Sequence, residues 1–149
     1  MALSNLDKRK KMKKFLTILL FIPFLGFAKG EIDWMDYDDA RALNSEKPIF
    51  VFGEMKFCST CQAMKEEVFS QPEIASLLNE SFIPVKNTSF ITGNHKFKDL
   101  KNKEGKPLKI VGSPAYVMIT GDEYKLAYGY KSPEEMKKML EFVLSEPKS

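Results

Sequence analysis

Two cysteines, Cys58 and Cys61, are the only ones in this 149-residue chain, and they stand three positions apart. They follow a continuous apolar run over 49–52 that is bounded by Gly53, and this pattern predicts a buried strand. From Cys58 onwards, apolar residues recur at helical spacing and predict a helix over 58–69. Cysteines at i and i+3 on a first helical turn can close a disulfide with little backbone movement. The pair therefore predicts thiol–disulfide exchange, in which one thiolate attacks and the other resolves the mixed disulfide.

The position of each cysteine on the helix predicts which one attacks. Cys58 lies at the helix N-terminus, where free N–H groups and the helix dipole favour a thiolate. Lys56, two residues earlier, adds positive potential. Cys61 lies one turn further and should be shielded. Cys58 is thus the predicted nucleophile, and Cys61 is the predicted resolving thiol.

A cysteine pair has three other common uses in proteins, namely zinc binding, covalent haem attachment and a structural disulfide. A zinc site needs four ligands, but the chain has one cysteine pair and a single histidine, His95. Covalent haem attachment needs a histidine after the second cysteine, and Gln62 stands there. A structural disulfide stays open, although so short a loop removes little chain entropy. We therefore expect no metal and no cofactor beyond the redox-active Cys58–Cys61 disulfide.

The elements around the pair predict one α/β domain. Acidic residues open a helix over 34–45, and further strands are predicted over 82–86, 115–120 and 126–130. Residues 92–109 predict a helix plus a loop. Ser70 and Ser132 each begin a capping-box pattern that opens a helix. The expected fold is a central mixed β-sheet flanked by helices, closed by a hairpin between residues 115 and 130.

The first 28 residues differ from the rest of the chain in charge. They hold six basic residues and one acidic residue, a net charge of +5, whereas the remaining 17 basic and 19 acidic residues give −2. The basic stretch runs into an apolar segment over 15–27 that ends in Gly26-Phe27-Ala28. This pattern predicts a cleaved signal peptide over 1–28 and a domain over 29–149. An uncleaved membrane anchor is the minor alternative, because the apolar run is short and Pro23 interrupts it.

A signal peptide places the domain in an oxidising compartment such as the bacterial periplasm, where cysteines tend to be paired. Because the basic excess lies in the leader, we expect no nucleic-acid partner.

A further motif, a Gly-Ser-Pro sequence, lies downstream of the cysteines. Gly112-Ser113-Pro114 precedes a predicted strand about 50 residues after the cysteines. Together, the strand, the Cys-x-x-Cys helix and this Ser-Pro resemble the thioredoxin-like family. The pattern is most similar to secreted bacterial members and to the C-terminal periplasmic domain of the membrane thiol–disulfide interchange reductase. The resemblance covers about residues 32–145 and includes Trp34, 47–49, 68–70, Pro72-Glu73 and 82–85.

That resemblance implies a thioredoxin-like fold and a periplasmic thiol–disulfide oxidoreductase that reduces protein disulfides. The implied partners are disulfide-containing proteins, with apocytochrome c as one substrate class, and a membrane thiol reductant conductor as electron donor. It also implies that Pro114 is a cis-proline packed beside the cysteines. Ser113 would then present its backbone to an extended substrate segment, aligning the substrate disulfide with Cys58.

The chain departs from the family pattern near the cysteines. Phe57 replaces the usual tryptophan, which keeps an apolar platform but loses an indole donor. Phe52 stands where many thioredoxins have a buried acid, so the proton of Cys61 would pass to water or to Glu54. These departures leave the redox direction open. The alternatives are a disulfide oxidase or isomerase, or a redox-inert peptide-binding module on the same fold.

Overall fold

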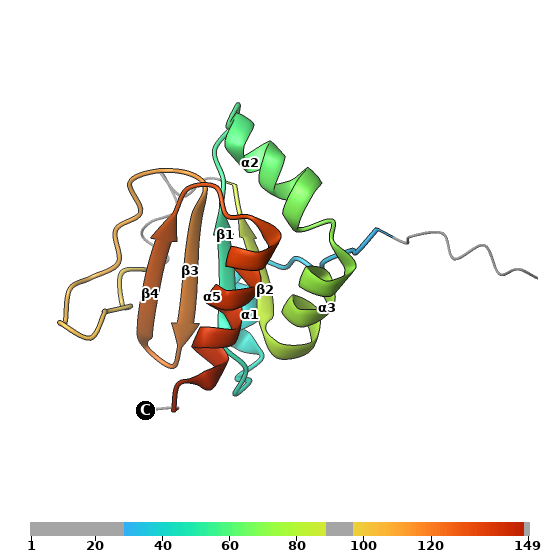
Figure 1. Ribbon diagram of the computed structural model, residues 1–149. Helices are drawn as coiled ribbons and strands as arrows, with labels where there is room; N and C mark the ends of the chain where they lie inside the picture. Colours follow the sequence, from blue (N-terminus) through green and yellow to red (C-terminus); the bar gives the residue numbers. More distant parts are fainter. Residues whose placement is uncertain (1–28, 89–96, 148–149) are drawn as a thin grey trace, which may run out of the picture.

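The computed structural model describes residues 29–88 and 97–147. Its centre is a four-stranded sheet in the order β2-β1-β3-β4 (Figure 1). β1 pairs in parallel with β2 and antiparallel with β3, and β3 pairs antiparallel with β4. The predicted mixed sheet is therefore confirmed. The strands are β1 (Ile49–Gly53), β2 (Ile83–Asn87), β3 (Ala115–Thr120) and β4 (Glu123–Tyr128).

The central position of β1 follows from its sequence. All five of its residues are buried, as expected of a strand that is apolar on both faces. Because side chains alternate along a strand, Phe50 and Phe52 contribute to one core and Ile49 and Val51 to the other. β2, which contains Pro84, is at an edge of the sheet, where a missing N–H is tolerated.

Helices cover both faces of the sheet. The core beside Phe50 and Phe52 is completed by the helices that follow the cysteines and by the C-terminal helix, whereas the opposite core is completed by the first helix and residues 97–110. Figure 1 shows α5 in front of the sheet and α1 behind it. The helices are α1 (Tyr37–Ala42), α2 (Ser59–Ala63), the π-helix η1 (Met64–Val68), α3 (Pro72–Ser81) and α5 (Pro133–Ser145).

An aromatic cluster supports the end of β1 that leads to the cysteines. The ring of Phe52 lies 4.8 Å from that of Phe69, 6.0 Å from that of Trp34 and 6.1 Å from that of Tyr116, centroid to centroid. Phe52 is completely buried. An apolar side chain here therefore packs as an integral part of the core.

The two predicted capping boxes differ in outcome. At Ser132 the box is confirmed, because its hydroxyl accepts from the Glu135 N–H and the Glu135 side chain accepts from the Ser132 N–H. At Ser70 the prediction is wrong. The N-cap of α3 is Gln71, without a side-chain cap, because the Ser70 hydroxyl instead donates to the carbonyl of Glu66 at the end of the preceding helix.

Other element predictions were wrong in their bounds or type. The first helix is shorter than 34–45, β4 begins and ends earlier than 126–130, and the helix over 58–69 becomes π-helical over Met64–Val68. Residues 97–109 form turns and isolated bridges, such as that between Lys101 and Pro107, without an α-helix in this stretch. Their buried Phe97, Leu100 and Leu108 belong to the core on this face of the sheet without an α-helix to carry them. Residues 92–96 of that prediction are outside the described residues.

The predicted signal peptide over 1–28 also lies outside the described residues. Within 29–88 and 97–147, no helix combines the length and apolar character needed to cross a membrane.

Candidate functional site

Cys58 and Cys61 form a disulfide at the N-terminus of α2. Cys58 is the N-cap residue, and its sulfur accepts a hydrogen bond from the Cys61 N–H at 3.1 Å. The Cα atoms are 5.2 Å apart, a distance at which two cysteines can be bridged. Cys61 is 1% exposed, whereas Cys58 is half-buried. This arrangement gives the two sulfurs different access to a partner, which is what a nucleophile and a resolving thiol require.

The loop between β1 and α2 presents an apolar side chain to solvent. Phe57 is fully exposed and has a φ of 60°, in the left-handed region that non-glycine residues rarely adopt. Met55 in the same loop is also exposed, and its carbonyl accepts from the Cys58 N–H at 3.3 Å. Phe57 therefore exposes an apolar ring beside Cys58 in the sequence, and its role as an apolar platform stays a prediction.

A cavity of about 630 Å³ opens beside Cys58. Charged and polar side chains from the β1–α2 loop and from the helix after the cysteines line it, and Cys61 is not part of the lining. The lining residues are Glu54, Met55, Lys56, Phe57, Cys58, Ser59, Gln62, Lys65 and Thr88.

Glu54 is the only buried charged residue in the described part of the chain, with 7% of its surface exposed. One carboxylate oxygen lies 2.9 Å from Nζ of Lys65, and the other lies 3.1 Å from Nζ of Lys86. Its backbone N–H donates to the carbonyl of Asn87 at 2.9 Å. Glu54 thus connects the end of β1 to η1 and to β2, and its carboxylate lies in the cavity that contains Cys58. Its predicted role as proton acceptor for Cys61 stays a prediction.

Sequence reasoning missed Lys65 and Lys86 as members of this site. The only sequence signal for this cluster is an acidic residue directly after a buried strand. The pairing arises only when β2 and η1 pack on either side of Glu54.

Ser113 and Pro114 lie at the same end of the sheet as the cysteines. The peptide bond between them is cis, and the next residue, Ala115, is the register partner of Gly53 at the end of β1. Pro114 is buried and Ser113 is half-buried. Neither residue lines the cavity beside Cys58, so their substrate-aligning role remains a prediction.

Gly129 anchors this cis-proline turn. Its N–H donates to the Pro114 carbonyl at 3.0 Å, and its own carbonyl accepts from the Tyr116 hydroxyl at 2.9 Å. Burial raises the pKa of Tyr116 far above its ordinary value, so the hydroxyl keeps its proton and remains a donor. Gly129 has a φ of 84°, which glycine adopts without strain.

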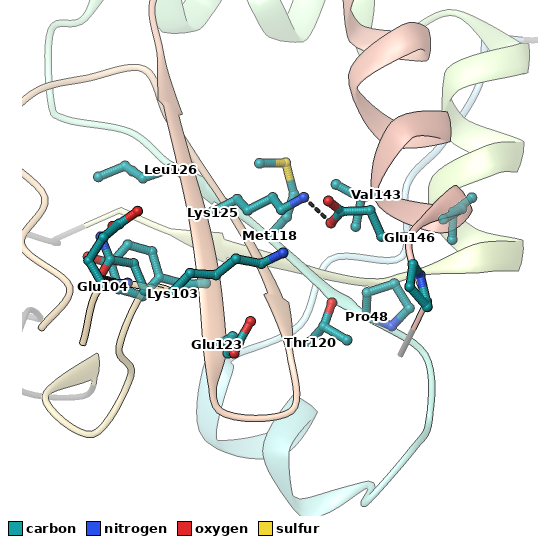
Figure 2. Close-up of a pocket in the computed structure, with 14 residues that line it drawn as sticks. Pro48, Lys103, Glu104, Met118, Thr120, Glu123, Lys125, Leu126, Val143 and Glu146 are labelled. Carbon is teal, nitrogen blue, oxygen red and sulfur yellow. Dashed lines mark hydrogen bonds and ion pairs between the residues drawn. The ribbon is translucent and has the colours of Figure 1, made fainter. Parts of the chain in front are cut away.

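A larger cavity, of about 660 Å³, lies at the opposite end of the sheet, where β3 and β4 join (Figure 2). An ion pair between Lys125 of β4 and Glu146 after α5 crosses it (Figure 2). Thr120 and Glu123 also line it, at the strand ends furthest from Gly53 and the cysteines. It holds no thiol, so the chemistry belongs to the smaller cavity.

Metal-ligating residues do not cluster in the described ranges: no group of three or more His, Cys, Asp or Glu side chains there could hold an ion. His95 is outside those ranges.

A family model described as the thioredoxin-like domain matches residues 35–144. This match covers most of the chain, and the chain therefore belongs to the thioredoxin-like family. Its Cys58–Cys61 disulfide lies at a helix N-terminus, a position that suits thiol–disulfide exchange.

Solved structures share the fold at low sequence identity. A thioredoxin from Thermus thermophilus is 19% identical, with a TM-score of 0.60, and the match covers 76% of this chain and 88% of the thioredoxin. A structure titled DsbH oxidoreductase is 16% identical, with a TM-score of 0.58, covering 81% of this chain and 90% of that one. These likenesses confirm the predicted fold.

Curated relatives match only part of the chain. Spermatogenesis-associated protein 20 of Rattus norvegicus is 36% identical over 64 residues, which are 41% of this chain and 8% of that protein. The Homo sapiens protein of the same name is 39% identical over 67 residues, which are 42% of this chain and 8% of that protein. The chain thus spans less than a tenth of the length of these relatives.

Proposed function

We propose that this protein is a periplasmic reductase of protein disulfides. The observation that carries the proposal is the asymmetric pair at the start of α2, in which Cys58 borders an open cavity and Cys61 is buried. A substrate disulfide can reach the first sulfur but not the second. The second is then available only after a mixed disulfide has formed, which is the order of events that dithiol reduction requires.

The reaction balances as a two-electron transfer. In the dithiol form, the Cys58 thiolate attacks one sulfur of the substrate disulfide, and the other substrate sulfur leaves as a thiolate. The Cys61 thiolate then attacks Cys58 Sγ, closes the Cys58–Cys61 disulfide and expels the second substrate thiolate. The substrate gains two electrons, and the two protons of the cysteine thiols end on the substrate thiols. The product is the disulfide form seen here.

A dithiol donor has to restore the reduced pair after each cycle. We assign this role to a membrane thiol reductant conductor, whose own dithiol would become a disulfide as Cys58–Cys61 opens. The support for this assignment is the sequence resemblance to the periplasmic domain of that reductase system, together with the predicted signal peptide over 1–28.

The substrate is proposed to bind as an extended segment along the cis-proline turn. A Pro114 without an N–H and a half-buried Ser113 stand at the sheet end that also carries Cys58. An extended segment that binds through its backbone hydrogen bonds gains affinity with little dependence on its side chains. Disulfides in unfolded or extended polypeptides, such as that of apocytochrome c, suit this geometry.

The central experiment separates catalysis from peptide binding. In a turnover assay with a model protein disulfide and excess dithiol, Cys58→Ser should abolish turnover. When the reduced Cys61→Ser variant is freed of dithiol and mixed with the same substrate, it should accumulate a mixed disulfide that is visible on a non-reducing gel. Unchanged turnover in Cys58→Ser would refute a redox role and leave the redox-inert binding module.

The redox potential of the Cys58–Cys61 pair, measured by equilibration with glutathione, decides between a reductase and an oxidase. A potential near the thioredoxin value of about −270 mV supports a reductase, and one near about −120 mV supports an oxidase. Fractionation of cells that express the full chain tests the location: recovery with periplasmic markers supports the proposal, and recovery in the cytoplasm contradicts it.

A further inference from the structure

Glu54 and its two lysines form a charged cluster that the exchange reaction itself does not use. The carboxylate is buried, and it contacts Lys65 from the helix after the cysteines and Lys86 from β2 at 2.9 and 3.1 Å. A buried carboxylate needs partners to offset its loss of hydration, and here both oxygens have one. One negative and two positive charges leave the cluster with a net charge of +1.

This cluster lies where it can act on Cys58. Glu54 and Lys65 line the same cavity as Cys58. Lys56 lines it as well and is exposed. Gln62 donates to Glu66 at 2.6 Å, which adds a further carboxylate on the outer side of the same helix. Among these groups, Glu54 is the buried one and is therefore the least screened by solvent.

We propose that Glu54 is a positioning residue for Cys58, which holds the ammonium groups of Lys65 and Lys86 and offsets one of their charges, so that the cysteine pair is more strongly reducing. The physical reason is that positive charge near an attacking cysteine stabilises its thiolate and hence the dithiol form, which makes a pair more oxidising. A negative charge in the same cavity has the opposite effect.

Three variants change the cluster charge in a way that predicts the sign of each effect. Glu54→Gln raises the charge from +1 to +2, Lys65→Met lowers it to 0, and the double variant restores +1. A unit charge about 8 Å from an ionising group changes its equilibrium by about two- to thirtyfold at effective dielectric constants between about 80 and 20. We expect the reduced form to be favoured about tenfold in Glu54→Gln, an increase of about 30 mV in potential.

Lys65→Met should favour the oxidised form of the cysteine pair, by about threefold. The effect is smaller than that of Glu54→Gln because the Lys65 side chain is 35% exposed and partly screened by solvent. The double variant should return close to the parent value. The pH midpoint of Cys58 alkylation by iodoacetamide should change in parallel. It should fall in Glu54→Gln, rise in Lys65→Met and return to the parent value in the double variant.

The matched control is Glu73→Gln, which removes a carboxylate that pairs with Lys137 between α3 and α5, outside the cavity lining. It should leave both the potential and the alkylation profile unchanged. Shifts of the same sign in Glu54→Gln and Lys65→Met, or no shift in either, would overturn the proposal, since a purely structural role predicts no reversal of sign. If Glu54→Gln does not fold, Lys65→Met decides alone: a fall in potential supports the proposal, and a rise or no change refutes it.

This inference rests on the proposed thiol–disulfide function but not on its direction. The potential of the parent protein tests whether it is a reductase, whereas the differences between variants test the role of Glu54. The proposed reductase function and the proposed role of Glu54 can therefore fail separately. Raising the ionic strength should reduce the differences between variants, because added salt screens the charges.

Discussion

Phe52 offers a direct test of how the core behind the site is built. Its side chain is fully buried and has three aromatic neighbours with ring centroids at 4.8 to 6.1 Å. Truncating a buried phenylalanine to alanine costs about 3–5 kcal/mol. Each aromatic pair adds about 0.5–1.5 kcal/mol beyond the area it buries. We therefore expect Phe52→Ala to lower the free energy of unfolding by about 4–5 kcal/mol, at the upper end of the range.

The assay is guanidinium unfolding of the oxidised protein, followed by far-UV circular dichroism and fluorescence of Trp34, the single tryptophan, which packs on Phe52. The transition midpoint should fall while its slope stays constant, because the surface exposed on unfolding hardly changes. Phe142→Ala is the matched control. Phe142 is 58% exposed, and Nζ of Lys125 lies 4.5 Å from its ring centroid. Phe142→Ala should therefore lower the free energy of unfolding by only about 0.5–1 kcal/mol.

Phe52→Asp places a carboxylate where many thioredoxins have a buried acid. Here the surroundings are aromatic, so the new group is buried without a partner and the loss should exceed that of Phe52→Ala by several kcal/mol. A loss below about 1.5 kcal/mol in Phe52→Ala would refute its role in the core. Equal stability of Phe52→Asp and Phe52→Ala would show that the aromatic surroundings of residue 52 accept a carboxyl group, which would contradict this prediction.

Two further predictions concern local structure. Ser132→Ala should lower the midpoint of thermal unfolding by a few degrees, because the capping box of α5 is lost. Hydrogen bonds from the backbone and hydroxyl of Ser132 lower the pKa of Glu135, so the stabilisation is present at neutral pH and lost as pH falls through that lowered value. The parent and Glu135→Gln midpoints should thus converge in acid, because the parent side chain is then uncharged as well, and a gap that stays constant would contradict the assignment. Gly30→Ala should destabilise by about 1–3 kcal/mol in urea unfolding, because a Cβ would lie 2.6 Å from the Cβ of Ala75 and under 3 Å from the backbone of Gln71 and Pro72; a neutral effect would show that the segment before α1 can move away.

Much of the fold was predictable because it depends on local patterns. A continuous apolar run predicted β1, and the Ser-Pro-Glu-Glu sequence predicted the start of α5, since capping is satisfied within four residues. The Ser-x-x-Glu pattern at Ser70 failed as a predictor, because the Ser70 hydroxyl donates to a carbonyl of the preceding helix and is not available as a cap. Residues 97–109 failed for a related reason: their apolar side chains are buried by contact with the sheet, which does not require a helix.

By itself, the sequence predicted thiol–disulfide chemistry and placed it at a strand-to-helix junction. Two cysteines three positions apart at a helix N-terminus can close a disulfide and favour a thiolate, and both are local properties of the chain. The tertiary structure alone decided the electrostatics around them. Lys65 and Lys86 meet Glu54 because η1 and β2 pack on either side of the end of β1, and Ala115 pairs with Gly53 because β3 runs antiparallel beside it. Such contacts join residues distant in the chain, and their partners cannot be identified until the sheet order is known.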